Sequence, residues 1–465
     1  MASNVIEKIR EAGIVGAGGA GFPSHVKFNV EAEVIVVNGA ECEPLIRVDQ
    51  QLMIVAVKQL IRGLVITLDH VGAKEGIIAI KGKHKQAVAL LEEACADDER
   101  LSVYILDDFY PAGDEQVTLY EATGRLVPQG GLPIHVGAVV TNVETLINVA
   151  AAVDEGKPVT DTYVTVTGQV PYPVTVKVPV GITVREILGL AGLTDTTGIG
   201  VIDGGPMMGS LLQDLDTPIS KSAKAYIVLP ESHHLIQLRN RSMKTISKTA
   251  QSACIQCRFC TDLCPRYLLG HQIEPHRIMN ALKYGDAAED VLRMAFTCCE
   301  CNMCEQFSCP AHMSPKTVNA QLKKQLAAQG LKPLDRPENQ VIDPHRKDRR
   351  VPTKRVVRRL GLADYDVPAP LSEEEYNFET VRVSLKQHIG APCIPIVQVG
   401  DTVKRGDKIG AVPERALGAP IHASIDGMIT EIISLQALFS SKCCNFQSQI
   451  ASYPFCCAWN TISGK

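Results

Sequence analysis

The chain has 465 residues, a formal net charge of −4 and a pI near 6.3, so its length allows about three domains and its charge indicates no nucleic-acid or anionic-membrane partner. The opening residues lack the basic and apolar regions of a signal peptide, and no uninterrupted run of about 18 apolar residues follows. We therefore expect a soluble, cytoplasmic protein with no membrane span. In that compartment its 16 cysteines should be metal ligands or free thiols before they are disulfides.

Residues 1–153 alternate apolar strands with amphipathic helices. The pattern predicts strands at residues 34–37, 77–80 and 102–106, and helices at residues 48–64, 85–95 and after Asp114. Because such alternation is typical of a parallel sheet covered on both faces, we expect a Rossmann-like α/β domain here.

Residues 160–230 have a different sequence pattern, with short β-rich runs separated by Gly and Pro. We predict strands at residues 163–166 and 174–178 and one helix at residues 184–191. This pattern fits a small mixed domain of the β-grasp (SLBB) type.

Residues 245–330 contain the same cysteine spacing twice, and each copy ends in Cys-Pro. Three cysteines at intervals of three wrap one face of a [4Fe–4S] cubane, and in two-cluster ferredoxins the cysteine before proline ligates the other cluster. Zinc is the alternative, but zinc sites usually pair C-x2–4-C units and seldom show such triplets. We therefore predict two [4Fe–4S] clusters, one held by Cys254, Cys257, Cys260 and Cys309 and one by Cys298, Cys301, Cys304 and Cys264.

Two details complete the cysteine module. Cys299 stands beside Cys298 and could replace it in register, but we interpret it as non-ligating. The interval of residues 265–297 is long for a compact bacterial ferredoxin and contains helical stretches at 275–284 and 287–296. A helical two-cluster ferredoxin module is therefore expected.

A basic segment, residues 331–375, follows the cysteines. Eight Arg or Lys residues gather between His345 and Arg359. The simpler interpretation is a solvated linker or short helix that bridges two domains, and the alternative is docking on an acidic partner.

Residues 376–433 consist of short predicted strands with repeated Asp-Gly turns, which is typical of a barrel-sandwich domain. The expected hairpin tip, residues 414–419, has no lysine, so we do not expect a covalently carried cofactor. Residues 434–465 are a compositional break in which no periodicity predicts an element, and we expect a disordered or frameshifted tail there.

The N-terminal region also contains a glycine loop. Glycines at positions 16, 18, 19 and 21 let the backbone approach a phosphate closely and offer N–H donors to it. Gly-rich turns are common, and this one does not follow a strand as a dinucleotide fingerprint should. Three further segments add weight to it: NGAECEP at 38–44, YPAGDEQ at 110–116 and VTNVETL at 140–146.

In order and spacing, these four segments resemble the flavin-binding subunit of respiratory NADH dehydrogenase and the C subunit of the Rnf complex, over roughly residues 1–330. The resemblance implies an FMN site. Its phosphate and ribityl chain would be lined by Gly16, Gly18, Gly19, Gly21 and Lys27; Asn38 and Glu41 would contact the ring and ribityl; and Gly113, Asp114, Val140, Thr141, Asn142 and Thr145 would complete the pocket.

The same resemblance implies that NADH is the substrate. Phe22 would stack on the nicotinamide or adenine, and Glu43 and Glu115 would hold NADH hydroxyls. The alternatives are that Phe22 belongs to the core and that Glu43 is a surface carboxylate. No residue is expected to act as a general acid or base.

The order of domains, with the barrel-sandwich after two cluster motifs, resembles the corrinoid reductases of propanediol-utilisation microcompartments. This resemblance implies electron transfer from NADH through FMN and the clusters to cob(III)alamin, giving cob(II)alamin or cob(I)alamin. It also implies an adenosyltransferase and shell proteins as partners, and a location inside a bacterial microcompartment. The alternatives are an NADH-input subunit of an Rnf-type membrane complex, or a relay that does not bind NADH.

Overall fold

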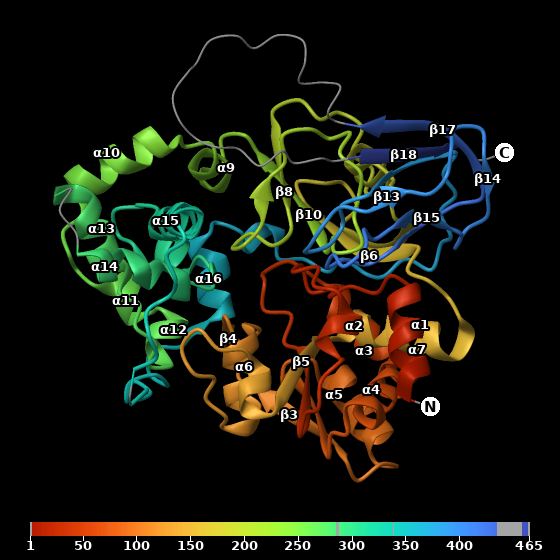
Figure 1. Ribbon diagram of the computed structural model, residues 1–465. Helices are drawn as coiled ribbons and strands as arrows, with labels where there is room; N and C mark the ends of the chain where they lie inside the picture. Colours follow the sequence, from red (N-terminus) through yellow and green to blue (C-terminus); the bar gives the residue numbers. More distant parts are fainter. Residues whose placement is uncertain (1, 285–287, 338, 435–457, 464–465) are drawn as a thin grey trace.

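A computed structural model describes residues 2–284, 288–337, 339–434 and 458–463 (Figure 1). The first domain is built on a four-stranded sheet in the order β3-β2-β1-β5, in which every pair is parallel. The strands are β1 (Val34–Gly39), β2 (Glu75–Lys81), β3 (Leu101–Leu106) and β5 (Ala138–Asn142). The three strands predicted in this domain are confirmed.

Helices cover both faces of this sheet. Ile35 and Val37 of β1 pack into one apolar cluster with α4 and α7, whereas Val34 and Val36 pack into another with α6. The other elements of the domain are α1 (Ala2–Glu11), α2 (Ser24–Lys27), α3 (Val48–Val55), α4 (Val57–Val71), α5 (Lys85–Cys95), β4 (Phe109–Tyr110), α6 (Glu115–Thr123), η1 (Pro133–Val136) and α7 (Val143–Glu155).

The helical stretch predicted over residues 48–64 is confirmed except at Ala56, where the chain turns by 92° and divides the stretch into α3 and α4. Ala56 leaves the helical region at the break, with φ −122° and ψ 27°. The turn lets α4 pack against α7 so closely that a Cβ on Gly63 would lie 1.9 Å from the carbonyl oxygen of Leu146. Tertiary packing therefore outweighs the helix propensity of Ala56.

The α3–α4 pair also bears on the expectation of no membrane span. In the described part of the chain, no single helix is long and apolar enough to cross a membrane. Only α3 and α4, taken together, have the length and the apolar composition of a membrane span, and they are bent relative to each other.

The second unit is a five-stranded mixed sheet in the order β7-β6-β10-β8-β9. Only β6 and β10 are parallel. Its elements are β6 (Asp161–Gly168), β7 (Val174–Pro179), α8 (Val184–Leu190), β8 (Ile199–Asp203), β9 (Ser210–Leu211) and β10 (Ala225–Pro230). A helix after an antiparallel hairpin and a last strand parallel to the first match the expected β-grasp pattern, while the SLBB assignment stays a prediction.

The cysteine module is helical, as predicted. Its elements are α9 (His234–Arg239), α10 (Met243–Ala253), α11 (Phe259–Asp262), α12 (Pro265–Leu268), α13 (Pro275–Tyr284), α14 (Glu289–Arg293), the 3-10 turn η2 (Met294–Thr297), the π-helical turn η3 (Met303–Ser308) and α15 (Pro315–Ala328). The prediction for residues 275–284 is confirmed. The helix predicted over 287–296 is shorter and passes into the 3-10 turn.

The basic segment contains a short helix, α16 (Thr353–Arg359), as the simpler interpretation allowed, but it is not solvated throughout. Arg346 and Arg350 both pair with Glu121 of the first domain and have side chains only 8% and 15% exposed. Their guanidinium groups lie over the rings of Tyr120 and Phe109, at 4.7 and 4.8 Å. The elements that follow are β11 (Val351–Pro352), paired with β4, α16 (Thr353–Arg359) and η4 (Ala363–Tyr365).

Two small sheets form the last domain, in the orders β12-β18-β17-β14 and β13-β15-β16. The strands are β12 (Thr380–Ser384), β13 (Ile394–Pro395), β14 (Thr402–Val403), β15 (Lys408–Ala411), β16 (Ile421–His422), β17 (Gly427–Ser434) and β18 (Ala458–Ser463). Val381, Ile409 and Ile429 share one apolar cluster with the β-grasp strands, so the two domains pack on a common core.

The tail prediction needs a correction at its end. Residues 458–463 form β18, which pairs with both β12 and β17, so an element exists where none was predicted. The pattern was missed because β18 depends on hydrogen bonds to two distant strands rather than on its own periodicity. The prediction for residues 435–457 lies outside the described residues.

Candidate functional site

The glycine loop is a compact turn between α1 and α2. The Gly16 N–H donates to the Phe22 carbonyl at 2.9 Å, and the Gly21 N–H donates back to the Gly16 carbonyl at 3.2 Å. At Gly19 φ is +99°, a conformation that disfavours any side chain, and no atom lies within 4 Å of the position its Cβ would take. The turn therefore leaves a cradle without side chains, which suits a phosphate-bearing group.

The companion segments meet this loop at the carboxyl ends of β1 and β5. The Ala17 N–H donates to Thr145 Oγ1 at 3.0 Å, and a Cβ on Gly18 would lie 3.6 Å from the Cβ of Asn142. Val140 and Thr141 occupy β5, in register with Val36 and Val37 of β1. The structure thus brings the first and fourth sequence motifs together.

The second and third motifs are joined by one amide. The Asn38 Nδ2 donates to the Gly113 carbonyl at 2.9 Å, while its Oδ1 accepts from the Ala40 N–H at 3.2 Å. A Cβ on Gly113 would lie 2.9 Å from the sulfur of Cys42, so glycine is needed for this approach. Asn38 and Gly113 are therefore in direct contact, while their role at a flavin stays a prediction.

Two charged residues of the third motif already have partners. Lys27 Nζ lies 2.7 Å from Glu115 Oε1. Asp114 caps α6 by accepting from the Gln116 N–H at 3.1 Å, and its other oxygen pairs with Arg266 of the cysteine module at 2.9 Å.

The two glutamates of the second motif point to different places. Glu41 accepts from the Asp49 N–H at 2.6 Å and from Gln50, at the start of α3. Burial, with the nearby charge of Asp49, raises the pKa of Glu41 to about 7. Glu43 instead accepts from the N–H groups of Met207 and Met208 in the β-grasp domain, at 2.9 and 3.0 Å, and burial raises its pKa.

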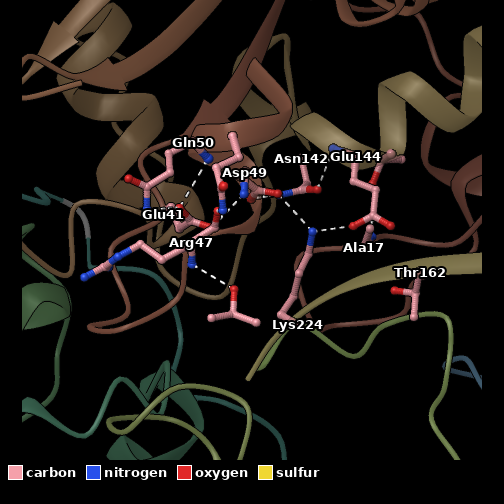
Figure 2. Close-up of polar contacts among 12 residues, drawn as sticks. Ala17, Glu41, Arg47, Asp49, Gln50, Asn142, Glu144, Thr162 and Lys224 are labelled. Atoms are coloured by element: carbon pink, nitrogen blue, oxygen red, sulfur yellow. Dashed lines mark hydrogen bonds and ion pairs between the residues drawn. The ribbon is translucent and has the colours of Figure 1, made fainter. Parts of the chain in front are cut away.

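A charged network behind Asn142 was not predicted from the sequence (Figure 2). Lys224, next to β10, reaches out of the β-grasp domain to Asp49 and Glu144, and its Nζ lies 2.9 Å from Asp49 Oδ1. The other Asp49 oxygen accepts from the Asn142 amide at 2.6 Å. All three charged side chains are at most 10% exposed. Although burial lowers the pKa of Lys224, the two carboxylates raise it above its usual value.

The first set of predicted cluster ligands surrounds one cavity. Cys254, Cys257, Cys260 and Cys309 all line it, and of these only Cys257 is exposed. The Met313 N–H donates to the Cys309 sulfur at 3.4 Å, a type of bond that tunes cluster thiolates. Four thiols on one cavity fit the predicted cage. In the described part of the chain, no group of three or more His, Cys, Asp or Glu side chains is arranged so that it could hold one metal ion.

The second set lies deeper, beside the flavin domain. Burial raises the pKa of Cys304 well above its usual range, and the neighbouring Cys298 and Cys264 raise it further. The Tyr110 hydroxyl donates to the carbonyl of Cys301 at 2.6 Å and lies 3.1 Å from Glu43. The third sequence motif and the cysteine module are therefore in direct contact.

Comparison with protein families identifies the types of domain. Residues 9–151 match the Nuo51 FMN-binding domain, residues 253–314 match a 4Fe-4S dicluster domain, and residues 371–447 match the RnfC barrel sandwich hybrid domain. The predictions of FMN and of iron–sulfur clusters are confirmed, and zinc is disfavoured. The number of clusters and the binding of NADH stay predictions.

Curated relatives identify the family. The chain is 47% identical to "Cobalamin reductase PduS" of Citrobacter freundii over 435 residues, which is 93% of this chain and 95% of that protein. It is also 47% identical to the protein of that name from Salmonella typhimurium strain LT2, with the same coverage. It is 34% identical to the C subunit of the "Na(+)-translocating ferredoxin:NAD(+) oxidoreductase complex" of Acetobacterium woodii, over 58% of this chain and 59% of that one. The chain belongs to the cobalamin reductase PduS family.

Proposed function

We propose that this protein is an NADH-dependent reductase that passes electrons from FMN and two [4Fe–4S] clusters to a corrinoid, reducing cob(III)alamin to cob(II)alamin or cob(I)alamin. The names of its two 47%-identical relatives and the match to FMN and dicluster domains support the proposal. When bound, FMN supplies hydride acceptance and one-electron donation, and each cluster supplies one-electron acceptance.

The observation that carries the proposal is the contact between the flavin loops and the cysteine module. Tyr110 and Asp114 belong to one short segment, and they bind the Cys301 carbonyl and Arg266 respectively. Arg266 stands two residues after the predicted ligand Cys264. The Arg266 and Asp114 side chains are 12% and 10% exposed, so this junction is largely buried. The chain therefore holds a two-electron and a one-electron site next to each other.

For FMN, we assign the phosphate and ribityl chain to the glycine loop and Lys27. The loop offers backbone N–H donors without side chains, and Lys27, one third exposed, can exchange Glu115 for a phosphate. The ring would lie along Asn38, Glu41 and Gly113. Asp114, Val140, Thr141, Asn142 and Thr145 would orient these elements through the contacts described above.

For NADH, we assign Phe22, Glu43 and Glu115. Glu115 has a side chain 38% exposed and can bind a hydroxyl directly. Glu43 and Glu41 line a cavity of about 410 Å³ together with Arg47, Lys83 and Lys354. Arg47 and Lys83 pair with Asp366 and Asp108, which also line the cavity, so these cations would have to exchange a carboxylate for a pyrophosphate. Because Glu43 accepts from two backbone N–H groups, it would have to exchange one of them to hold NADH.

The finer assignments follow from the family. We propose a Rossmann-like flavin domain, an SLBB β-grasp domain, and a location in a microcompartment with an adenosyltransferase and shell proteins as partners. We also propose that the domains begin and end where the sequence predicts.

Anaerobic reconstitution with iron, sulfide and FMN tests the proposal. We expect about eight iron atoms and one FMN per chain, bleaching of the flavin by NADH, and NADH oxidation that depends on hydroxocobalamin. Lys27→Met should weaken FMN binding, whereas Lys74→Met, a change at an exposed lysine of the same domain, should not.

The outcomes separate the alternatives. Cluster absorbance without flavin reduction by NADH would indicate a relay and overturn the proposal. NADH bleaching with no corrinoid reduction would favour an NADH-input role of the Rnf type, which co-purification with membrane subunits would support.

A further inference from the structure

The barrel-sandwich domain has no role in the proposed electron path, yet it contacts the glycine loop. In Figure 1 its strands, in blue, lie above α1 and α2, which flank that loop, and Lys408 of β15 pairs with Glu11 of α1. The Ile389 N–H donates to the Gly21 carbonyl at 2.9 Å. A Cβ on Gly21 would lie 3.5 Å from both the Gln387 carbonyl oxygen and the His388 Cα. One end of the loop is therefore seated on residues 387–389.

The other end of the loop is held by a buried lysine. Lys221, 3% exposed, donates from Nζ to the Gly13 carbonyl at 2.9 Å and to the Pro420 carbonyl at 3.0 Å. Its own N–H donates to the Gln387 side chain at 2.9 Å. One side chain thus joins the flavin domain, the β-grasp domain and the barrel-sandwich domain.

The burial of Lys221 is costly, and no structural role inside its own domain explains it. Its Nζ donates to carbonyl oxygens from two other domains rather than to a carboxylate. Burial lowers the pKa of Lys221 to about 7, a cost that a methionine of similar length would avoid. A buried polar group that costs stability in this way is a candidate for a positioning role.

Loop entropy explains what such positioning would achieve. Glycine loses more conformational freedom on ordering than any other residue, and residues 16–21 contain four of them, so a ligand that must order this loop binds more weakly. A loop that the protein has already fixed at both ends spares the ligand this loss.

We propose that the barrel-sandwich domain is a brace for the flavin-binding loop, and that Lys221 and the Ile389 N–H are positioning groups that preorganise it for FMN. This inference rests on the proposal that the glycine loop binds FMN. It gives the C-terminal domain a role in cofactor binding that needs no cofactor of its own.

Two matched pairs of variants test the brace in the full-length chain. Lys221→Met removes the buried clamp, while Lys408→Met removes an exposed ion pair with Glu11 at the same domain boundary. Ile389→Pro removes the N–H that binds Gly21, while Ile389→Ala keeps it, and the Ile389 side chain is 49% exposed. FMN affinity is measured by flavin fluorescence, together with the visible circular dichroism of bound FMN, iron content and thermal unfolding.

We expect Lys221→Met and Ile389→Pro each to weaken FMN binding by about tenfold or more, as the loss of one such hydrogen bond allows, with iron content retained. Lys408→Met and Ile389→Ala should bind FMN like the unchanged protein. Wild-type affinity in both test variants, or equal weakening in test and control variants, would overturn the brace. Failure of the unchanged protein to bind FMN would instead overturn the proposed function.

Discussion

The two proposed cysteine cages and the proposed flavin site are assembled over different distances along the chain. Each proposed cage takes three ligands from one run of seven residues and the fourth from the Cys-Pro pair that follows the other run, all within residues 254–309. The proposed flavin site would take its lining from four segments of the first domain, which are contacted by Lys224, Lys221 and residues 387–389. The cages therefore depend on local spacing, whereas the flavin site depends on the packing of three domains.

The largest expected effect is a loss of iron, which tests whether the locally spaced cysteines hold a cluster. Cys309→Ala removes one of the four thiols around the outer cavity, so we expect the variant to lose about four iron atoms per chain after reconstitution and to keep the other four. Iron and sulfide analysis checks this, with flavin content as the control, since the cages and the flavin site should respond separately. Full iron content in the variant would contradict the ligand assignment.

Removal of Lys224 tests whether the flavin site depends on contacts between domains. Lys224→Met leaves Asp49 and Glu144 buried without their cation, and breaking such a pair costs about 3–5 kcal/mol. We expect lower stability in urea and a loss of bound FMN, because Asp49 also holds the Asn142 amide. Lys177→Met, at an exposed lysine of the same domain, is the control. A Lys224 variant as stable as this control would show that the network contributes little.

The pH dependence of stability gives a smaller effect at the same site. The pKa of Glu41 is raised from 4.5 to about 7, chiefly by burial, so the folded protein binds more protons than the unfolded chain between these values. Stability from this group is therefore present below about pH 4.5 and falls as the pH rises to about 7. Glu41→Gln keeps an acceptor for the Asp49 N–H and should flatten this part of the profile. Urea unfolding of the protein without FMN, from pH 5 to 7.5, measures it; an unchanged slope would assign the dependence to other groups.

The same contrast explains what the sequence could predict. The strands of the first domain and the repeated cysteine spacing are local patterns, and the structure has them where they were expected. Lys224 carries no such signal, since its partners, Asp49 and Glu144, are 175 and 80 residues away. The break at Ala56 was missed for the same reason, because alanine favours a helix and the close packing of Gly63 on α7 is a long-range contact.

The arginines of the basic segment show how a local pattern can mislead. A run of like charges normally marks a solvated surface, and several of these residues are exposed. Arg346 and Arg350 instead cover Tyr120 and Phe109 and share Glu121. For these two residues, the acidic partner considered as an alternative is part of the same chain.

The smallest expected effect concerns the spare cysteine. Only Cys298 keeps the intervals of three that match the first run, and its sulfur accepts from the Glu300 N–H at 3.4 Å. The Cys299 thiol lies beside the Cys301 thiol and the Arg266 side chain, which together lower its pKa. We therefore expect Cys299→Ala to keep its full iron content and Cys298→Ala to lose about four atoms per chain. The reverse result would mean that contact with the flavin domain, rather than local spacing, determines which cysteines hold the second cluster. Local spacing would then determine the ligands of the first cluster alone.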